Sequence, residues 1–411
     1  MRQTEVVIIG AGQAGLAVSR LLTERGVDHV VLERGRTAER WRSRSWRSLR
    51  LLTPNWMTRL PRWRYGGPEP SGFMPAADVV RYLEAYAGSF AAPVLPDARV
   101  DVVRREFGHF VVDSNAGSFT ARGVVIATGA CQQPAVPLLA AGLHPGIRQL
   151  TADAYADPDV LPPGGVLVVG ASASGTQLAD ELHSAGRHVV LAVGRPTRAT
   201  RRYRGRDYLW WLDAMHVLDR PLDPHRRRPE PSWQLVGDHR RTVDLPSLAG
   251  RGVRLAGRLA GMEGHRLVFD DSLPVSAAAA DARFRRLLSR IDDFAEATGL
   301  DQDIEPADGA AIRRVGGPGV ERVDAREFGT VIWATGYRRR YSWLQVPVCD
   351  ARGEIIHVNG STPAPGLFVV GLPNQTRHSS TLIDGVRFDA QIVVDSLVNS
   401  VLPVTGVGRA S

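Results

Sequence analysis

The chain has 411 residues, of which 44% are hydrophobic, and it carries a formal net charge of +8. This length and composition are typical of a globular protein with about two or three domains. All 51 basic residues are arginines spread through the chain, which excludes a Schiff-base or P-loop lysine and gives no concentrated basic patch for nucleic acid.

A strand, a helix and a second strand are expected near the N-terminus, over residues 5–10, 12–25 and 29–33. The turn into the helix reads Gly10-Ala11-Gly12-Gln13-Ala14-Gly15. In such a turn the first glycine allows the bend, the second lets the backbone approach a pyrophosphate, and the third lets helix and strand pack closely. The pattern therefore predicts a dinucleotide site at the start of the helix.

Glu33 ends the second strand, 18 residues after Gly15. A carboxylate at this place accepts hydrogen bonds from the adenosine ribose and repels a 2′-phosphate. We therefore expect the first site to suit FAD or NAD and to disfavour NADP, with Arg34 as a neighbouring ligand.

The next stretch, residues 41–63, alternates between polar and aromatic residues and predicts a loop-rich connection around Thr53-Pro54-Asn55-Trp56. Strands are expected near residues 100–103, 110–113 and 124–127. The last of them ends in Ala127-Thr128-Gly129. A proline-rich segment, residues 134–163, predicts a crossing between domains.

A second strand, helix and strand are expected over residues 166–170, 174–185 and 188–193. Their turn reads Gly170-Ala171-Ser172-Ala173-Ser174-Gly175, in the register of the first. One such turn is weak evidence, but two indicate two dinucleotide sites. A serine-nucleophile turn is disfavoured, because Ser174 stands where that turn needs a glycine. A nucleotide domain that no longer binds stays an alternative.

Arg195 stands at the ribose position of this second unit, and Arg198 follows closely. An arginine there can pair with a 2′-phosphate through two parallel hydrogen bonds, which favours NADPH over NADH. The alternative is that Arg195 is an ordinary surface charge.

The regular pattern weakens over residues 201–305, where we expect a lid-like insertion with a helix over residues 278–297. It resumes with a strand over residues 330–334, which ends in Ala334-Thr335-Gly336-Tyr337. The last expected elements are a strand over residues 367–371 and a helix over residues 383–398.

Together these features resemble the two-dinucleotide flavoproteins, and among them the flavin-containing monooxygenases with the YUCCA-like and CzcO-like proteins. The resemblance rests on both glycine turns, Glu33, the Trp41 to Pro54 stretch, both Ala-Thr-Gly segments and the Gly366 to Gly371 strand. It implies an α/β fold of two Rossmann-like dinucleotide-binding domains, each with three layers (ββα), with the NADPH domain inserted in the FAD domain. The implied boundaries are residues 1–155 and 346–411 for the FAD-binding domain and residues 156–345 for the NADPH-binding domain with its insertion.

The same resemblance implies that NADPH reduces FAD, and that oxygen then forms a C4a-hydroperoxyflavin that oxygenates a small amine, sulfide or carbonyl compound. Two alternatives stay open: an NAD(P)H-dependent FAD oxidoreductase or oxidase that inserts no oxygen, and a nucleotide-binding sensor without turnover. One departure from the family signature favours the first alternative, since the position of the signature histidine falls on Leu150 or Thr151.

The resemblance also implies residue roles. Thr53 and Asn55 are expected beside the isoalloxazine, and Trp41 is expected at its edge, with core packing as the alternative for Trp41. His378 is the histidine best placed near the ring, with a structural role as the alternative. The last helix is expected to begin near Leu382 and to present N–H groups where negative charge grows on the reduced ring. The other expected cofactor ligands outside the glycine turns are Val100, Ala127, Thr128, Gly129, Ala334, Thr335, Gly336 and Gly371.

Cys131 and Cys349 stand far apart without a Cys-x-x-Cys motif, and the histidines lack metal-ligand spacing, so we expect no disulfide framework and no metal. No apolar run approaches the roughly 20 residues of a membrane span. We therefore expect a cytoplasmic enzyme that uses FAD, NADPH, molecular oxygen and a small-molecule substrate. Neither nucleic acid nor a membrane is expected as a partner, and a homodimer is a candidate assembly.

Overall fold

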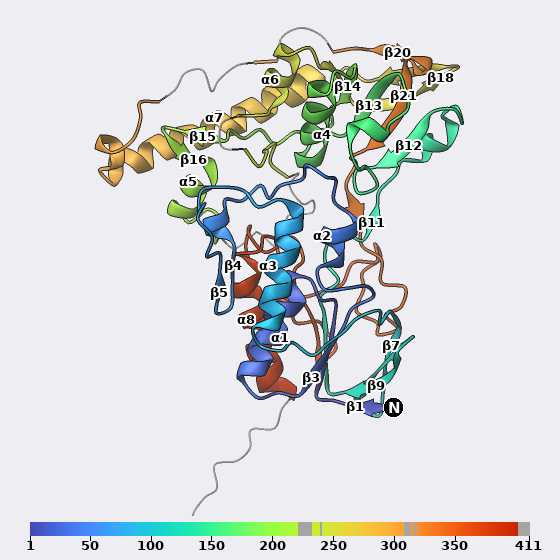
Figure 1. Cartoon of the computed structure of the whole chain (residues 1–411), viewed down its shortest axis with the longest axis vertical. Coiled ribbons are helices and arrows are strands. Elements are labelled where there is room, and N and C mark those ends of the chain that lie inside the picture. The colour runs from blue at the N-terminus through green and yellow to red at the C-terminus, as the bar shows by residue number, and fades with distance from the viewer. Residues whose placement is uncertain (221–231, 239–240, 308–313, 316–318, 402–411) are drawn as a thin grey trace, which may run out of the picture.

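The structure, a computed structural model, describes residues 1–220, 232–238, 241–307, 314–315 and 319–401. Two lobes stand one above the other in Figure 1, each built around a five-stranded parallel sheet. The first and last parts of the chain form the lower lobe, and the middle part forms the upper lobe. The expected α/β fold with two Rossmann-like domains is therefore confirmed.

The lower sheet joins short hydrophobic strands in the order β23-β10-β2-β3-β6. Their bounds are Leu367–Val369, Gly123–Ile126, Val6–Ile9, His29–Leu32 and Val94–Leu95. Side chains alternate along β2, so Val6 and Ile8 pack against helices while Val7 and Ile9 pack against a second sheet. All four residues of β2 are buried, as expected of a parallel strand that is covered on both faces.

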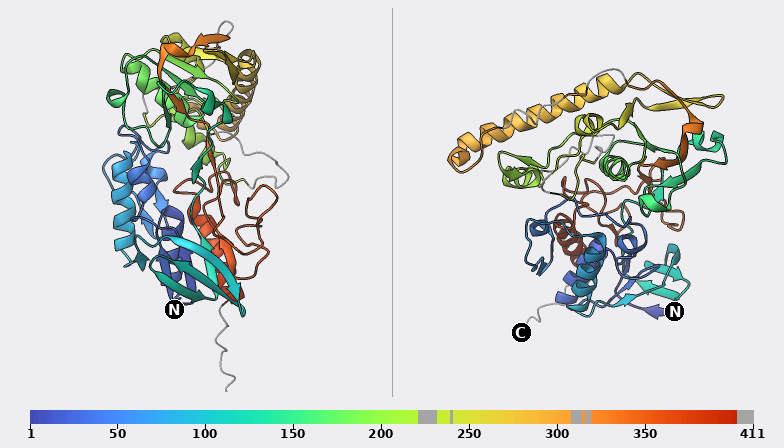
Figure 2. Two further views of the ribbon diagram at one scale, coloured as in Figure 1. Left: turned by 90° about the vertical axis from the view of Figure 1, so that its right-hand side faces the viewer. Right: turned by 45° about the horizontal axis from the view of Figure 1, so that its top comes forward.

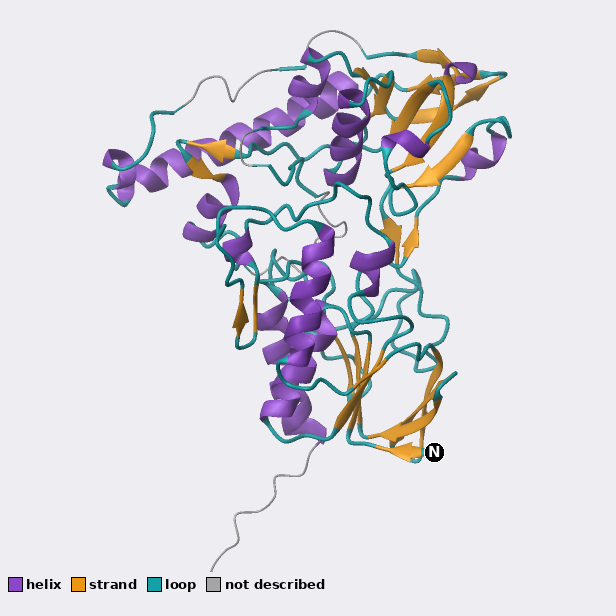
Figure 3. Cartoon of the chain, viewed as in Figure 1, coloured by secondary structure: helices purple, strands orange, loops and turns teal. Residues whose placement is uncertain are grey.

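Helices cover one face of this sheet and an antiparallel sheet covers the other (Figure 3). The helices are α1 (Gln13–Glu24), α3 (Ala76–Gly88) and α8 (Val386–Val401). The antiparallel sheet consists of β1 (Arg2–Gln3), β9 (Gly117–Ala121), β8 (His109–Ser114) and β7 (Val100–Glu106). The result is the expected ββα layering, in which α8 packs on α1 and returns the end of the chain to the first lobe.

The upper lobe repeats this layering around a sheet of order β12-β21-β13-β14-β17. Its strands are Arg148–Thr151, Phe328–Trp333, Gly165–Val169, Val189–Ala192 and Arg254–Ala256. One face packs against α4 (Ala173–Ser184) and α6 (Leu245–Gly250). The other packs against β18 (Leu259–Glu263), β19 (Arg266–Phe269) and β20 (Arg322–Asp324).

A two-stranded ribbon links the lobes. β11 (Gln133–Pro134) leads up from the first lobe and pairs antiparallel with β22 (Tyr337–Arg338), which leads back. The Thr335 hydroxyl donates a hydrogen bond to the Ala135 carbonyl at 2.7 Å. Both Ala-Thr-Gly segments therefore lead directly into the connection between the two dinucleotide domains.

The segment expected as a lid is only partly an insertion. It contributes a hairpin of β15 (Arg202–Tyr203) and β16 (Arg206–Asp207), then α5 (Tyr208–Ala214) and the long α7 (Leu273–Ala297), which crosses the upper lobe (Figure 2). Residues 254–269 were expected to belong to the insertion. They instead form β17, β18 and β19, which belong to the sheets of the upper lobe. These strands are only three to five residues long, too short to give a periodic pattern.

Other differences concern single elements. β12 places residues 148–151 in the upper sheet, although the expected boundary at residue 155 assigned them to the first domain. It is a polar edge strand, so it carries no hydrophobic alternation. Otherwise the domain boundaries stay a prediction. Within residues 41–63 the chain is mainly irregular, and the short elements there are α2 (Glu39–Ser43), a 3₁₀ turn (Asn55–Met57), β4 (Arg59–Leu60) and β5 (Trp63–Arg64).

His29 makes the stability of the lower lobe depend on pH. Its Nδ1 lies 2.8 Å from the Val27 carbonyl and its Nε2 lies 2.8 Å from the Ser19 hydroxyl, and burial lowers the pKa of the ring. The unfolded chain therefore takes up a proton at higher pH than the folded chain. We expect the free energy of unfolding to fall as the pH drops below about 6.5, as urea titrations will measure.

The matched control is His29→Gln, which has no titrating ring. Its free energy of unfolding should depend less on pH between about pH 7 and pH 5 than that of the wild type. Equal pH dependence in both proteins would contradict this assignment.

Candidate active site

The first glycine turn has the geometry of a pyrophosphate cradle. Gly10 has φ +108°, and a Cβ there would lie 2.7 Å from the Ala127 carbonyl oxygen. A Cβ on Gly15 would lie 1.9 Å from the Gly10 carbonyl oxygen, so helix and strand touch backbone to backbone. Gly12, at the N-cap of α1, has open space where its Cβ would be, and no side chain caps this helix. The residues present therefore fit a dinucleotide phosphate at this helix terminus.

Glu33 lies beside this turn. It is buried, its Oε2 accepts a hydrogen bond from the Ala11 N–H at 2.7 Å, and its Oε1 accepts one from the Gly35 N–H at 3.1 Å. The Glu33 carbonyl accepts from the Ala98 N–H at 2.7 Å, which ties the backbone of Glu33 to the segment that precedes β7. The Arg34 side chain is exposed, and the expected contacts of Arg34 and Val100 with the cofactor stay predictions.

The C-terminal part of the chain closes on the same turn. A Cβ on Gly371 would lie 2.9 Å from the Ala14 Cβ, so this glycine packs directly on α1. The last helix was expected to begin near Leu382. In the structure α8 begins at Val386, about one turn later. Only glycine fits directly before α8, because a Cβ at Gly385 would lie 1.9 Å from the Ser379 carbonyl oxygen.

Thr53 and Asn55 lie buried in one loop of the lower lobe. Asn55 uses both ends of its amide: Nδ2 donates to the Glu69 carbonyl at 2.9 Å, and Oδ1 accepts from the Met74 N–H at 2.8 Å. The side chain therefore fixes residues 69–74 against the loop. Its expected contact with the flavin stays a prediction, as does that of Thr53.

The aromatic residues of the Trp41 to Pro54 stretch divide between the lobes. Trp41 is partly buried and packs on the hydrophobic core of the lower lobe, whereas Trp46 is buried in the core of the upper lobe. Trp46 therefore packs in a hydrophobic core, and Trp41 is only partly buried. His378 is half-buried in the loop that precedes α8.

Asp389 is a residue that the sequence analysis missed. It is fully buried in the first turn of α8, it accepts a hydrogen bond from the Thr376 hydroxyl, and burial raises its pKa. A polar residue inside a helix pattern gives no signal of its own. It places an acidic side chain at the positive end of the helix that is expected to face the flavin.

The second glycine turn repeats the geometry of the first. Gly170 also has φ +108°, and a Cβ on Gly175 would lie 1.7 Å from the Gly170 carbonyl oxygen. A Cβ on Gly170 would lie 2.4 Å from the Ala334 carbonyl oxygen, just as Gly10 meets Ala127. Ser172 is the N-cap of α4 without a side-chain cap bond, and Ser174 lies in the first turn, half-buried.

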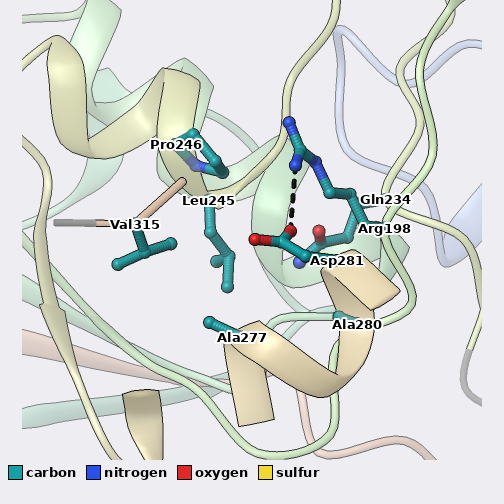
Figure 4. A pocket seen from close by; sticks show the side chains of 8 residues that line it. All are labelled: Arg198, Gln234, Leu245, Pro246, Ala277, Ala280, Asp281 and Val315. Atoms are coloured by element: carbon teal, nitrogen blue, oxygen red, sulfur yellow. Dashed lines mark hydrogen bonds and ion pairs between the residues drawn. The ribbon is translucent and has the colours of Figure 1, made fainter. Parts of the chain in front are cut away.

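Arg195 and Arg198 have different surroundings. Arg195 is exposed three residues after the end of β14, where the ribose of a dinucleotide on this unit is expected. Arg198 is buried, and its guanidinium donates to Asp244 at 2.8 Å and to Asp281 at 2.9 Å. Figure 4 shows the Arg198 and Asp281 pair in the wall of a cavity of about 10 Å³, room for about one water molecule. The expected role of Arg198 as a phosphate ligand is therefore contradicted, because two carboxylates inside the lobe already compensate its charge.

Gln234 was also missed. Its side chain is 1% exposed and donates a hydrogen bond to the Ala171 carbonyl, inside the second glycine turn, at 2.8 Å. No sequence pattern marks it, because its partner is 63 residues away. Gln234 holds the turn from the side of residues 232–238.

The insertion covers the loop that carries Asn55. Met57 is buried in one hydrophobic cluster with Leu209, Trp211 and Leu212 of α5. Trp211 is fully buried and its indole N–H donates to the Tyr203 carbonyl at 2.8 Å, while the adjacent Trp210 is only partly buried. The two neighbouring tryptophans thus have different environments, because adjacent residues of a helix point to different faces.

The remaining residues that the sequence singles out lie in β12 and beside the linking ribbon. Leu150 and Thr151, where the family signature places a histidine, end β12, and the Thr151 hydroxyl donates to Asp153 at 2.6 Å. Thr128 receives a hydrogen bond from the Gln132 amide at 2.9 Å, and Gly129 and Gly336 both have positive φ at the start and end of the linking ribbon.

Neither a group of three or more potential metal ligands nor a helix long and apolar enough to cross a bilayer occurs in the described part of the chain.

Comparisons with known proteins agree with this geometry. A profile of the pyridine nucleotide-disulphide oxidoreductase family matches residues 7–215. An uncharacterized CzcO-like oxidoreductase of Geobacillus kaustophilus is 30% identical over 399 residues, which cover 96% of this chain and 98% of that protein. The indole-3-pyruvate monooxygenase YUCCA4 of Oryza sativa subsp. japonica is 35% identical over 424 residues, covering 95% of this chain and 87% of that protein.

Among solved structures, a flavin-containing monooxygenase from Stenotrophomonas maltophilia aligns over 97% of this chain and 99% of its own, with a TM-score of 0.69 and 20% identity. This likeness shows a shared fold. The sequence matches show the family: the chain belongs to the pyridine nucleotide-disulphide oxidoreductases, and among them to the flavin monooxygenase-like oxidoreductases.

Proposed function

We propose that this oxidoreductase is an NADPH-dependent FAD monooxygenase that oxygenates a small organic substrate. The cofactors are FAD and NADPH. One observation carries the proposal: two glycine turns of the same geometry occur in one chain, and a buried carboxylate follows the first while an exposed arginine follows the second. The carboxylate suits the ribose of FAD, and the arginine suits the 2′-phosphate of NADPH.

The protein residues bind and orient the two cofactors, and FAD supplies the redox and oxygen chemistry when bound. The N-termini of α1 and α4 present uncapped N–H groups to the two pyrophosphates. The α5 cluster over Met57 excludes water from the Thr53 to Asn55 loop. An amine, a sulfide or a carbonyl compound is the proposed substrate, with molecular oxygen as the second.

The direct experiment uses purified protein. We expect a yellow protein that contains FAD, is bleached by NADPH, and consumes oxygen together with NADPH. Oxygenated product from a panel of amines, sulfides and ketones supports the monooxygenase. Absence of bound FAD, also after incubation with FAD, contradicts the proposal.

Arg195 is expected to set the preference for NADPH. In Arg195→Ala the ratio of kcat/KM for NADPH to that for NADH should fall by about 10- to 100-fold, because a charge-assisted bidentate pair contributes about 1.5–3 kcal/mol. Steady-state kinetics with both nucleotides measure this. The NADH value should change little, and an unchanged ratio would contradict the role of Arg195.

A specific observation favours a second candidate. Leu150 and Thr151 stand where the family signature has its histidine, and Thr151 bonds to Asp153 instead. If that histidine is needed for oxygen insertion, the enzyme is an NAD(P)H-dependent FAD oxidoreductase or oxidase. Peroxide formed in proportion to NADPH consumed, without oxygenated product from any substrate, identifies this activity.

A cytoplasmic location and a homodimer also belong to the proposal. Light scattering at micromolar concentration tests the dimer.

A further inference from the structure

Arg201 is a buried cation at the junction of the two lobes. It follows the Arg195 segment and precedes β15, and its side chain is 1% exposed. Its Nη2 donates to Asp207 at 2.6 Å, which supplies the compensating charge. A buried guanidinium needs such a partner, and removal of one member of a buried ion pair is strongly destabilising.

The remaining contacts of Arg201 reach both lobes. Nη1 donates to the Leu52 carbonyl at 2.8 Å, in the lower lobe, and to the Val236 carbonyl at 3.3 Å, in the upper lobe. The guanidinium also lies 4.8 Å from the centre of the Phe73 ring, again in the lower lobe. Only an arginine offers a planar fork that can donate to three acceptors and stack on an aromatic ring at once.

One lower-lobe partner of Arg201 lies next to the Thr53 to Asn55 loop in the chain, and the other lies next to Met74, which bonds to Asn55. Leu52 directly precedes Thr53, and Phe73 directly precedes Met74, whose N–H donates to the Asn55 side chain at 2.8 Å. Arg201 therefore restrains both segments that hold the Thr53 to Asn55 loop.

The upper-lobe partner leads to the second glycine turn. Val236, which accepts from Arg201, stands two residues after Gln234, which donates to the Ala171 carbonyl at 2.8 Å. A continuous chain of contacts thus runs from Ala171 through Gln234, Val236 and Arg201 to Leu52. One end, Ala171, lies in the second glycine turn, where NADPH is expected. The other end, Leu52, directly precedes the Thr53 to Asn55 loop, which is expected beside the flavin.

We propose that Arg201 is a positioning residue, which holds the flavin-side loop and the pyridine-nucleotide turn in the relative placement that hydride transfer requires. This inference rests on the proposed function. The side chain acts through Leu52 and Val236 and does not take part in the chemistry. Misplacement of reacting groups by about 1 Å can lower a rate about 100-fold, so a residue of this kind affects kcat more than binding.

The test compares Arg201→Lys with Arg204→Gln. Lysine keeps the charge but cannot reach all three acceptors. Arg204 is a matched control, because it is 13% exposed and pairs with Asp292 and Asp301 inside the upper lobe. In rapid-mixing experiments, Arg201→Lys should retain FAD, show a rate of flavin reduction at saturating NADPH that is about 10- to 100-fold lower, and change the Kd for NADPH less than about threefold. Arg204→Gln should stay within about twofold of the wild type in both.

A second readout does not need turnover. Hydrogen exchange of the backbone amides of residues 52–57 should be faster in Arg201→Lys than in the wild type, without NADPH, and unchanged in Arg204→Gln. If Arg201→Lys does not accumulate as folded protein, Phe73→Leu replaces it, because it removes the ring beside the guanidinium and keeps the ion pair with Asp207, and it should show both changes at a smaller size.

Wild-type reduction rates in Arg201→Lys, losses no larger than in Arg204→Gln, or unchanged exchange at residues 52–57 would overturn the inference. If NADPH does not reduce the flavin of the wild type, the proposed function fails, and the exchange comparison alone then decides the role of Arg201.

Discussion

Gly15→Ala should yield a protein that no longer retains FAD. The added Cβ would lie 1.9 Å from the Gly10 carbonyl oxygen, and the obstacle is backbone rather than a flexible side chain. α1 cannot move away, because it packs on β2 and β3 of the sheet and is flanked by α3 and α8. The overlap must therefore deform the turn that is proposed to cradle the pyrophosphate of FAD. We expect the affinity for FAD to fall by at least about 100-fold, or about 2.7 kcal/mol.

FAD content after purification and titration of the apoprotein with FAD measure the effect. Gly88→Ala is the matched control, because it adds the same methyl group at the end of α3, where no atom lies within 4 Å. It should bind FAD like the wild type. Full FAD content in Gly15→Ala would contradict the assignment of the first turn.

Arg198→Ala should destabilise the protein by about 3–5 kcal/mol, since it leaves two buried carboxylates, Asp244 and Asp281, without their cation. These side chains are only 6% and 7% exposed, so bulk solvent does not reach the two carboxylates to compensate their charge. Chemical denaturation followed by circular dichroism measures the loss, and we expect the upper lobe to unfold first.

Arg195→Ala serves as the comparison, because the same residue type three positions earlier is exposed. It should change stability by no more than about 0.5 kcal/mol. The two variants should therefore differ in what they change: Arg195→Ala should change the preference for NADPH over NADH, and Arg198→Ala should change the free energy of unfolding. An Arg198→Ala variant with wild-type stability and a lost preference for NADPH would restore Arg198 as the phosphate ligand that the sequence suggested.

The glycine turns and their flanking strands were predictable because their constraints are local. A turn that brings backbone against backbone tolerates no side chain at Gly10 or Gly15, and the buried parallel strands beside it require continuous apolar runs. The ββα layering followed from the resemblance that these motifs carry.

The parts that could not be predicted depend on contacts between distant segments. Arg198 and Arg195 look alike in the sequence, but Asp281 of α7, 83 residues away, buries the first in an ion pair. β17 and β12 are short edge strands that are recognised only by their partners in the upper sheet. The role proposed for Arg201 likewise depends on its hydrogen bond to the carbonyl of Leu52, which stands 149 residues earlier in the chain. No local pattern encodes such pairings.

The central claim is that a hydride passes from NADPH at the second turn to FAD at the first. Anaerobic titration with NADPH of the wild type and of Gly175→Ala, whose added Cβ would lie 1.7 Å from the Gly170 carbonyl oxygen, tests it most directly. We expect one equivalent of NADPH to bleach the wild-type flavin, whereas Gly175→Ala keeps its FAD and is bleached by dithionite but not by NADPH. Equal bleaching of both proteins by NADPH would contradict the claim.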